Sequence, residues 1–178
     1  MTERTVLHVW SSPRTLSTAT MYSFSQRADT SAYDEPLYPF YLKENPEIQR
    51  PYRSELLSHN DYNSNGNEVL QQHYDWQLGR NVSVFDSVDL EGGGDTTTIH
   101  YLKHIAKFYN DNIDKKLIFG NGHKHVILVR DPLDVIASYN DRCSAGSTGG
   151  TCNIDDLGFL KLSQVSDVLC RCSGLGLL

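Results

Sequence analysis

The feature that most constrains the fold is a short apolar run followed directly by a polar turn and a helical pattern, between Thr5 and Arg27. The run VLHVW has the length and apolar content of a buried strand. Pro13 interrupts it, because proline lacks an N–H group and holds the preceding residue extended. From Thr15 onward apolar residues recur at helical spacing. The pattern predicts a buried strand, a tight turn and a helix.

The turn itself has the chemistry of an anion-binding site. Backbone N–H groups and the helix dipole concentrate partial positive charge at a helix N-terminus, which favours phosphate or sulfate. Arg14 adds a full charge, and Thr15, Ser17 and Thr18 offer hydroxyl donors. An ordinary capped helix start explains the same residues. The turn is not a Walker A loop, because it has no glycine and no lysine, and this disfavours an ATPase or GTPase.

A second unit of the same kind follows much later in the chain. The apolar run at 126–129 predicts a buried parallel strand, and Asp131-Pro132 suits the start of a helix. Arg130 and Ser138 are expected to face the same crevice as Arg14. The alternative for Arg130 is an ion pair with Asp134.

Two further strands are predicted between these units. One, at 31–36, places Asp34 and Glu35 at a carboxyl end, where α/β proteins usually bind ligands; two solvated loop acids are the alternative. The other, at 96–105, ends in Lys103-His104. His104 is a candidate general base there, although any one of seven histidines is more often ordinary surface.

Three other segments leave alternatives open. Tyr38, Phe40 and Tyr41 could line an acceptor pocket or cover the core. The glycine loop at 91–95 is interpreted as a linker. The four cysteines all lie late in the chain, so free thiols are favoured over a disulfide framework, with an unusual metal site as the weaker alternative.

Length and charge limit the class of protein. A chain of 178 residues predicts one domain with room for a core. The net charge of -6 argues against a nucleic-acid partner, because such proteins show a basic face. No apolar run approaches membrane-spanning length and no secretory signal is recognisable, so the prediction is a cytoplasmic protein without a membrane partner.

Together the two units resemble the sulfotransferase family. That family's first motif, Pro-Lys-Ser-Gly-Thr-Thr, aligns with 13–18, with Arg14 in place of lysine and Leu16 in place of glycine. Its second motif, an arginine followed by Asn/Asp-Pro and a later serine, matches Arg130, Asp131-Pro132 and Ser138. The segments HVWSSPRTLSTA, DEPLY, RPYR and LKHIAK most resemble a sulfotransferase-like branch that is also fused to aminotransferase-like domains in plants.

The resemblance implies a donor, a set of roles and a fold. The donor is 3′-phosphoadenylyl sulfate, no metal is required, and the acceptor is a small molecule. Arg14 and His104 are the implied catalytic residues, as charge stabiliser and base. The implied donor-binding residues are Ser12, Pro13, Arg14, Thr15, Ser17, Thr18, Arg130 and Ser138. The predicted fold is a three-layer α/β/α domain with a mainly parallel sheet, like P-loop nucleoside triphosphate hydrolases.

The end of the chain leads to a further expectation and to alternatives. The resemblance implies a single domain over residues 1–178 that lacks the family's later segment. Leu160, Val165 and Leu169 are then expected to be uncovered, and the chain to be a weakly stable, weakly active form. The alternatives are a nucleotide- or phosphate-binding module without catalysis and, less favoured, a P-loop kinase or NTPase.

Overall fold

The computed structural model describes residues 3–48, 50, 53–58, 65–80, 97–120, 122–144 and 153–172. One sheet contains the strands β1 (Thr5–Ser11), β2 (Thr30–Asp34), β3 (Ile99–Ile105) and β4 (His123–Leu128). The helices are α1 (Ser17–Ser25), α2 (Tyr38–Glu44), α3 (Arg53–Ser58), α4 (Gly66–Gln77), α5 (Lys116–Phe119), α6 (Pro132–Ser144) and α7 (Phe159–Cys172). Two 3-10 helices, η2 (Ala106–Phe108) and η3 (Ile154–Leu157), lie among them.

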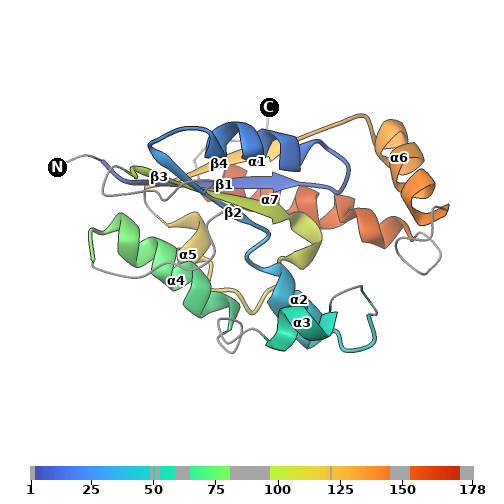
Figure 1. Cartoon of the computed structure of the whole chain (residues 1–178), viewed down its shortest axis with the longest axis horizontal. Coiled ribbons are helices and arrows are strands. Elements are labelled where there is room, and N and C mark those ends of the chain that lie inside the picture. The colour runs from blue at the N-terminus through green and yellow to red at the C-terminus, as the bar shows by residue number, and fades with distance from the viewer. Residues whose placement is uncertain are drawn as a thin grey trace.

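The sheet is parallel throughout, with strand order β2-β3-β1-β4 (Figure 1). The apolar run at the start of the chain is therefore a central strand, hydrogen-bonded to β3 on one side and β4 on the other. Parallel pairing brings the carboxyl ends of all four strands to one edge of the sheet. The predicted α/β fold with a parallel sheet is confirmed.

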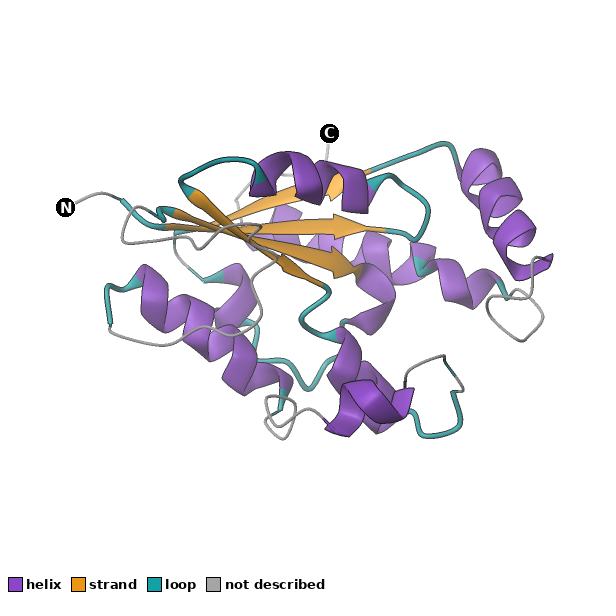
Figure 2. Ribbon diagram, in the orientation of Figure 1, coloured by secondary structure: helices purple, strands orange, loops and turns teal. Residues whose placement is uncertain are grey.

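Helices cover both faces of the sheet (Figure 2). Side chains alternate along β1, so Val6 and Trp10 join a large core cluster with residues of α4, α5 and α7. Val9 faces the other way and packs with Met21 of α1 and Tyr101 of β3. The result is the three-layer arrangement that the strand and helix patterns predicted.

Histidines occupy an unusual share of the interior. His8, His73, His100, His104 and His123 are all buried. Two of the rings bond to His8, with His104 Nε2 at 3.0 Å from its Nδ1 and His123 Nδ1 at 2.9 Å from its Nε2. Burial is the largest cause that lowers the pKa of each ring, to about 3 for His73 and His104 and to about 2 for His100. The core therefore contains neutral imidazoles.

Two expectations about the later part of the chain need correction, and a third is not tested. Val165 is fully buried and Leu169 packs against the large core cluster, because α7 lies across one face of the sheet; only Leu160, 74% exposed, is uncovered. Cys143 is in a disulfide, whereas Cys170 carries a thiol, so the cysteines are not all free. The predicted glycine linker at 91–95 lies outside the described residues.

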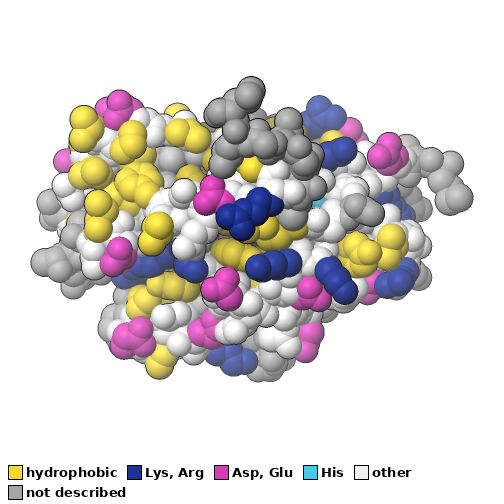
Figure 3. All heavy atoms as spheres, turned by 180° about the vertical axis from the view of Figure 1, so that it is seen from behind, with side chains coloured by type: hydrophobic (Ala, Val, Ile, Leu, Met, Phe, Trp, Pro, Cys, Tyr) yellow, Lys and Arg dark blue, Asp and Glu magenta, His cyan; other side chains and the backbone are white. Residues whose placement is uncertain are grey.

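Apolar side chains gather near α6, which lies at one end of the molecule in Figure 1 and on the left of the reverse view in Figure 3. The largest exposed apolar side chains of this region are Val129, Leu133, Ile154 and Leu160. Among the described side chains of α6, only Val135 is buried. The helix is thus held mainly through its first turns, next to the carboxyl end of β4.

The buried histidines lead to a prediction about acid stability. Each has a folded-state pKa below the ordinary value of 6.5, so the unfolded chain binds more protons as the pH falls. Stability is complete above pH 6.5 and is lost progressively below it, by roughly 2 kcal/mol for each such histidine at about pH 5. Urea unfolding followed by circular dichroism, from about pH 7.5 to about pH 5, measures this loss.

A variant separates the histidines from other acid-sensitive groups. His104→Gln removes one titrating ring. The free energy of unfolding should then fall less with decreasing pH, by the contribution of one histidine. A free energy of unfolding that stays constant across this pH range would contradict the prediction.

Candidate functional site

The turn after β1 has the backbone of an anion cradle. Arg14 and Leu16 both adopt left-handed backbone conformations, with φ of 66° and 62°. Left-handed residues in a turn aim successive N–H groups into one concavity, and α1 begins directly after Leu16. A left-handed conformation costs a non-glycine residue about 1–2 kcal/mol. Leu16 stands where the family motif has glycine, and it still adopts the left-handed conformation that glycine favours.

The hydroxyls of Thr15 and Ser12, at the start of this turn, differ in their hydrogen bonding. Thr15 Oγ1 donates to the carbonyl of Ser12 at 2.8 Å and closes the turn. The Ser12 side chain is 1% exposed, and its hydroxyl has no hydrogen-bond partner within the described residues. An orphaned buried hydroxyl beside an anion cradle fits a site for an oxyanion.

The second motif meets the first at the edge of the sheet. Arg14 Nε donates to Ser138 Oγ of α6 at 2.9 Å, and Arg130 Nη1 donates to the Arg14 carbonyl at 3.0 Å. Arg130 Nη2 also lies 3.7 Å from Asp134 Oδ2, so the ion pair considered as the alternative is present as well. The structure therefore brings together residues separated by more than a hundred positions, as the matching motifs predicted.

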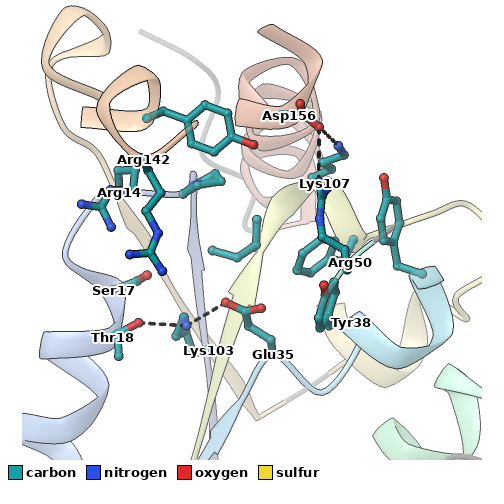
Figure 4. Close-up of a pocket in the computed structure, with 15 residues that line it drawn as sticks. Arg14, Ser17, Thr18, Glu35, Tyr38, Arg50, Lys103, Lys107, Arg142 and Asp156 are labelled. Atoms are coloured by element: carbon teal, nitrogen blue, oxygen red, sulfur yellow. Dashed lines mark hydrogen bonds and ion pairs between the residues drawn. The ribbon is translucent and has the colours of Figure 1, made fainter. Parts of the chain in front are cut away.

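A cavity of about 410 Å³ opens beside this meeting point (Figure 4). Its lining contains five basic side chains and two acidic ones, in a chain whose net charge is -6. The lining residues are Pro13, Arg14, Ser17, Thr18, Glu35, Tyr38, Tyr41, Arg50, Lys103, Ile105, Lys107, Phe108, Tyr139, Arg142 and Asp156. The cavity is thus a local basic site on an acidic protein.

Lys103 lies at the centre of the cavity wall and is 3% exposed. Its Nζ contacts Asp34 Oδ1 at 2.6 Å and Glu35 Oε1 at 2.8 Å, and Thr18 Oγ1 at 3.1 Å. Burial alone would lower the pKa of Lys103, but the two carboxylates outweigh it and raise that pKa. Lys103 is therefore a permanent cation that ties β3 to β2 and α1.

Glu35 follows the last residue of β2 and lines the same cavity. Burial raises the pKa of its carboxyl group above the ordinary value, and the Lys103 ammonium only partly offsets this. Its backbone is left-handed, with φ of 51°, which turns the chain from β2 toward α2. Glu35 thus places a carboxyl group with a raised pKa, able to accept or donate a proton, at the ligand edge of the sheet.

His104 lies on the opposite face of β3 from Lys103. Adjacent residues of a strand point to opposite faces, so His104 joins the buried histidines, is 2% exposed and stacks on Trp10 with 4.3 Å between ring centroids. It does not line the described cavity. The two residues of the Lys103-His104 pair therefore have separate places, one in the cavity and one in the core.

The other predicted site residues divide in a similar way. Pro13, Arg14, Ser17 and Thr18 line the cavity, whereas Ser12 and Thr15 support the turn from within. Arg130 and Ser138 contact Arg14 from outside the lining. Of the aromatic residues after β2, Tyr38 and Tyr41 line the cavity and Phe40 is buried.

Several lining residues were not predicted. No role was predicted for Arg50, Lys107, Tyr139, Arg142 or Asp156, although Arg50 and Lys107 lie in segments that carry the family resemblance. One local signal was available, because Lys107 lies four residues after Lys103. Another was the pair of arginines in RPYR: Arg53 donates to the Leu42 carbonyl at 2.6 Å and the Ile48 carbonyl at 3.0 Å. Arg53 thereby closes the end of α2 and holds the segment that carries Arg50.

The described residues contain neither a ready-made metal site nor a helix that could span a membrane. Among them, no group of three or more His, Cys, Asp or Glu side chains is arranged to hold a metal ion. None of the helices in this part of the chain is long and apolar enough to cross a membrane.

Comparisons with known proteins show what this chain is similar to. A family model described as "Sulfotransferase domain" matches residues 5–72, from β1 into α4. The branched-chain-amino-acid aminotransferase-like protein 1 of Arabidopsis thaliana is 37% identical over 78% of this chain and 21% of its own length. The aminotransferase-like protein 2 of the same plant is 35% identical over 75% of this chain and 20% of its own length.

The chain matches part of each relative and matches no solved structure. The chain spans about a fifth of the length of the two curated relatives. The resemblance predicted from the sequence is confirmed to this extent: residues 5–72 match the model of a sulfotransferase domain, and both relatives are aminotransferase-like proteins of a plant.

Proposed function

We propose that this chain transfers a sulfuryl group from 3′-phosphoadenylyl sulfate to the hydroxyl or amine of a small-molecule acceptor. The observation that carries the proposal is the contact between the two basic motifs, Arg14 Nε to Ser138 Oγ at 2.9 Å and Arg130 Nη1 to the Arg14 carbonyl at 3.0 Å. Two separate strand-turn-helix units that converge on one basic edge suit a donor with two separate anionic groups.

The donor is assigned to the end of the cavity near the turn. Arg14, Ser17 and Thr18 line this end, and Arg142 lies close to it (Figure 4). We assign the phosphosulfate to Arg14, the two hydroxyls and the N–H groups of the turn, and the 3′-phosphate to Arg130 and Ser138. The orphaned hydroxyl of Ser12 and the left-handed turn are consistent with an oxyanion in this place.

Charge stabilisation and positioning carry the chemistry in this proposal, by analogy with phosphoryl transfer. Arg14 neutralises the charge that develops on the leaving phosphate. We assign the acceptor proton to Glu35 in place of His104, because Glu35 lines the cavity and His104 is buried with a pKa of about 3. Lys103 holds the Glu35 carboxylate in position at 2.8 Å.

The first test concerns donor binding. Arg130→Ala should weaken binding of adenosine 3′,5′-bisphosphate by about 1.5–3 kcal/mol, the usual contribution of hydrogen bonds to charged groups. Adenosine 5′-phosphate lacks the 3′-phosphate, so its affinity should change much less. Isothermal titration calorimetry without magnesium measures both ligands, and Arg27→Ala, which removes an exposed arginine paired with Asp29, is the matched control.

Other outcomes of the same titration favour other functions. Equal losses for the two nucleotides would mean that Arg130 acts on folding or on general charge. Binding of ATP that depends on magnesium would favour a kinase or NTPase. Tight binding of the bisphosphate with no transfer to any acceptor would leave a nucleotide-binding module.

The second test concerns the proton acceptor. Glu35→Gln should lower turnover roughly 100-fold or more and leave donor affinity nearly unchanged, because general base catalysis contributes on this scale. In the unsubstituted chain, turnover should rise with pH through the raised pKa of Glu35, since only the ionised carboxylate accepts a proton.

The neighbouring acid provides a matched control. Asp34 also pairs with Lys103, at 2.6 Å, but its carboxylate is not part of the cavity lining. Asp34→Asn should retain most of the turnover, because the amide oxygen still accepts a hydrogen bond from Lys103 and Glu35 still balances the lysine charge. Full activity in Glu35→Gln, together with loss of activity in a folded His104→Gln, would return the role of base to His104.

A further inference from the structure

The end of the cavity away from Arg14 has its own set of charged and aromatic side chains. We call it the far end and define it by Tyr38, Tyr41, Arg50, Lys107, Phe108 and Asp156. In Figure 4 Arg50, Lys107 and Asp156 lie opposite Arg14 and Arg142, with Lys103 and Glu35 between the two groups. The far end is thus separated from the turn by the proposed reaction centre.

The far end has more positive than negative charge. Lys107 Nζ forms an ion pair with Asp156 Oδ1, and Arg50 Nη2 lies 3.9 Å from the same oxygen. Two cations therefore converge on one carboxylate, and both are largely shielded from solvent, with side chains 27% exposed for Arg50 and 17% for Lys107. Partly buried cations in excess are unfavourable beside a neutral ligand and favourable beside an anion.

Aromatic rings line the same space. The Phe108 ring lies 4.7 Å from Tyr38 and 4.9 Å from Tyr41, measured between ring centroids, at interplanar angles of 32° and 40°. Lys107 Nζ lies 5.6 Å from the centroid of Tyr41, within cation–π range. Ring faces of this kind pack best against another flat unsaturated group.

We propose that the acceptor is an aromatic hydroxy acid, whose ring lies against Tyr38, Tyr41 and Phe108 and whose carboxylate pairs with Lys107 and Arg50. The proposal rests on the proposed function, since it names the acceptor of that reaction. It places the acceptor's hydroxyl near Glu35, between its own carboxylate and the donor.

The reaction balances with these components alone. The acceptor oxygen forms a bond to sulfur while the bond between sulfur and the bridging phosphate oxygen breaks. The hydroxyl proton goes to the Glu35 carboxylate, and the electron pair of the broken bond leaves with adenosine 3′,5′-bisphosphate. The sulfated acceptor therefore carries two anionic groups, one at each end of its ring.

The test compares two probes that differ at one group, a charged carboxylate in one and its uncharged methyl ester in the other. Para-hydroxybenzoate and its methyl ester have the same ring and hydroxyl, but only the first has a carboxylate. With the chain saturated by adenosine 3′,5′-bisphosphate, we expect the acid to bind about tenfold or more tightly than the ester, the range for charged hydrogen bonds. Isothermal titration calorimetry measures the ratio, which should fall as salt is raised.

Substitutions on the two sides of the far-end ion pair should act in opposite directions. Lys107→Gln should remove most of the preference for the acid, and Asp156→Asn should increase it, because one removes positive charge and the other negative charge. Lys43→Gln is the matched control, since Lys43 is an exposed lysine in the last turn of α2 and is not part of the lining.

The outcomes separate this inference from the proposed function. If the bisphosphate binds but the acid and the ester bind equally, or neither binds, the acceptor class is wrong and the proposed function stands. If Lys107→Gln and Asp156→Asn shift the preference in the same direction, the far end does not recognise the carboxylate. If the bisphosphate itself does not bind, the proposed function fails first.

Discussion

The ion pairs of Lys103 are the interaction on which the site depends. A lysine that is 3% exposed is strongly destabilising unless its charge is balanced, and here Asp34 and Glu35 balance it at 2.6 and 2.8 Å. The third contact, to Thr18, extends the same ammonium group to α1. One buried charge thereby fixes three chain segments at the carboxyl edge of the sheet, and it places Glu35 between the two ends of the cavity.

The alternation of side chains along the strands explains how this edge is coupled to the core. On β3, Lys103 faces the cavity while His104 faces the buried histidines, because consecutive residues point to opposite sides of a sheet. On β1, His8 bonds to His104 of β3 and His123 of β4 and so links β1 to both of its neighbouring strands within the core. The neutral imidazoles thus lie within the core, whereas the ion-paired Lys103 lies with Asp34 and Glu35 at the carboxyl end of the sheet.

The turn after β1 shows that a backbone conformation can be kept without the residue that favours it. Leu16 has the left-handed conformation that glycine adopts most easily, and its side chain is 70% exposed, where it clashes with nothing. The strain is opposed by contacts around it, including the Thr15 hydrogen bond and the Arg130 contact to the Arg14 carbonyl. A rigid, strained turn of this kind is typical of a binding site.

The sequence by itself determined the two strand-turn-helix units and their basic motifs. Hydrophobic periodicity and proline placement are local properties, so β1, β4, α1 and α6 and their arginines could be predicted from neighbouring residues. The tertiary structure alone decided which of these residues share a cavity. Strand order places β3 between β1 and β2, and helix packing decides which face of β3 meets the cavity and which the core. Packing also brings Arg50, Lys107 and Asp156 together. Such contacts join residues far apart in the chain, and no local pattern encodes them because their energy comes from burial and charge in the folded state.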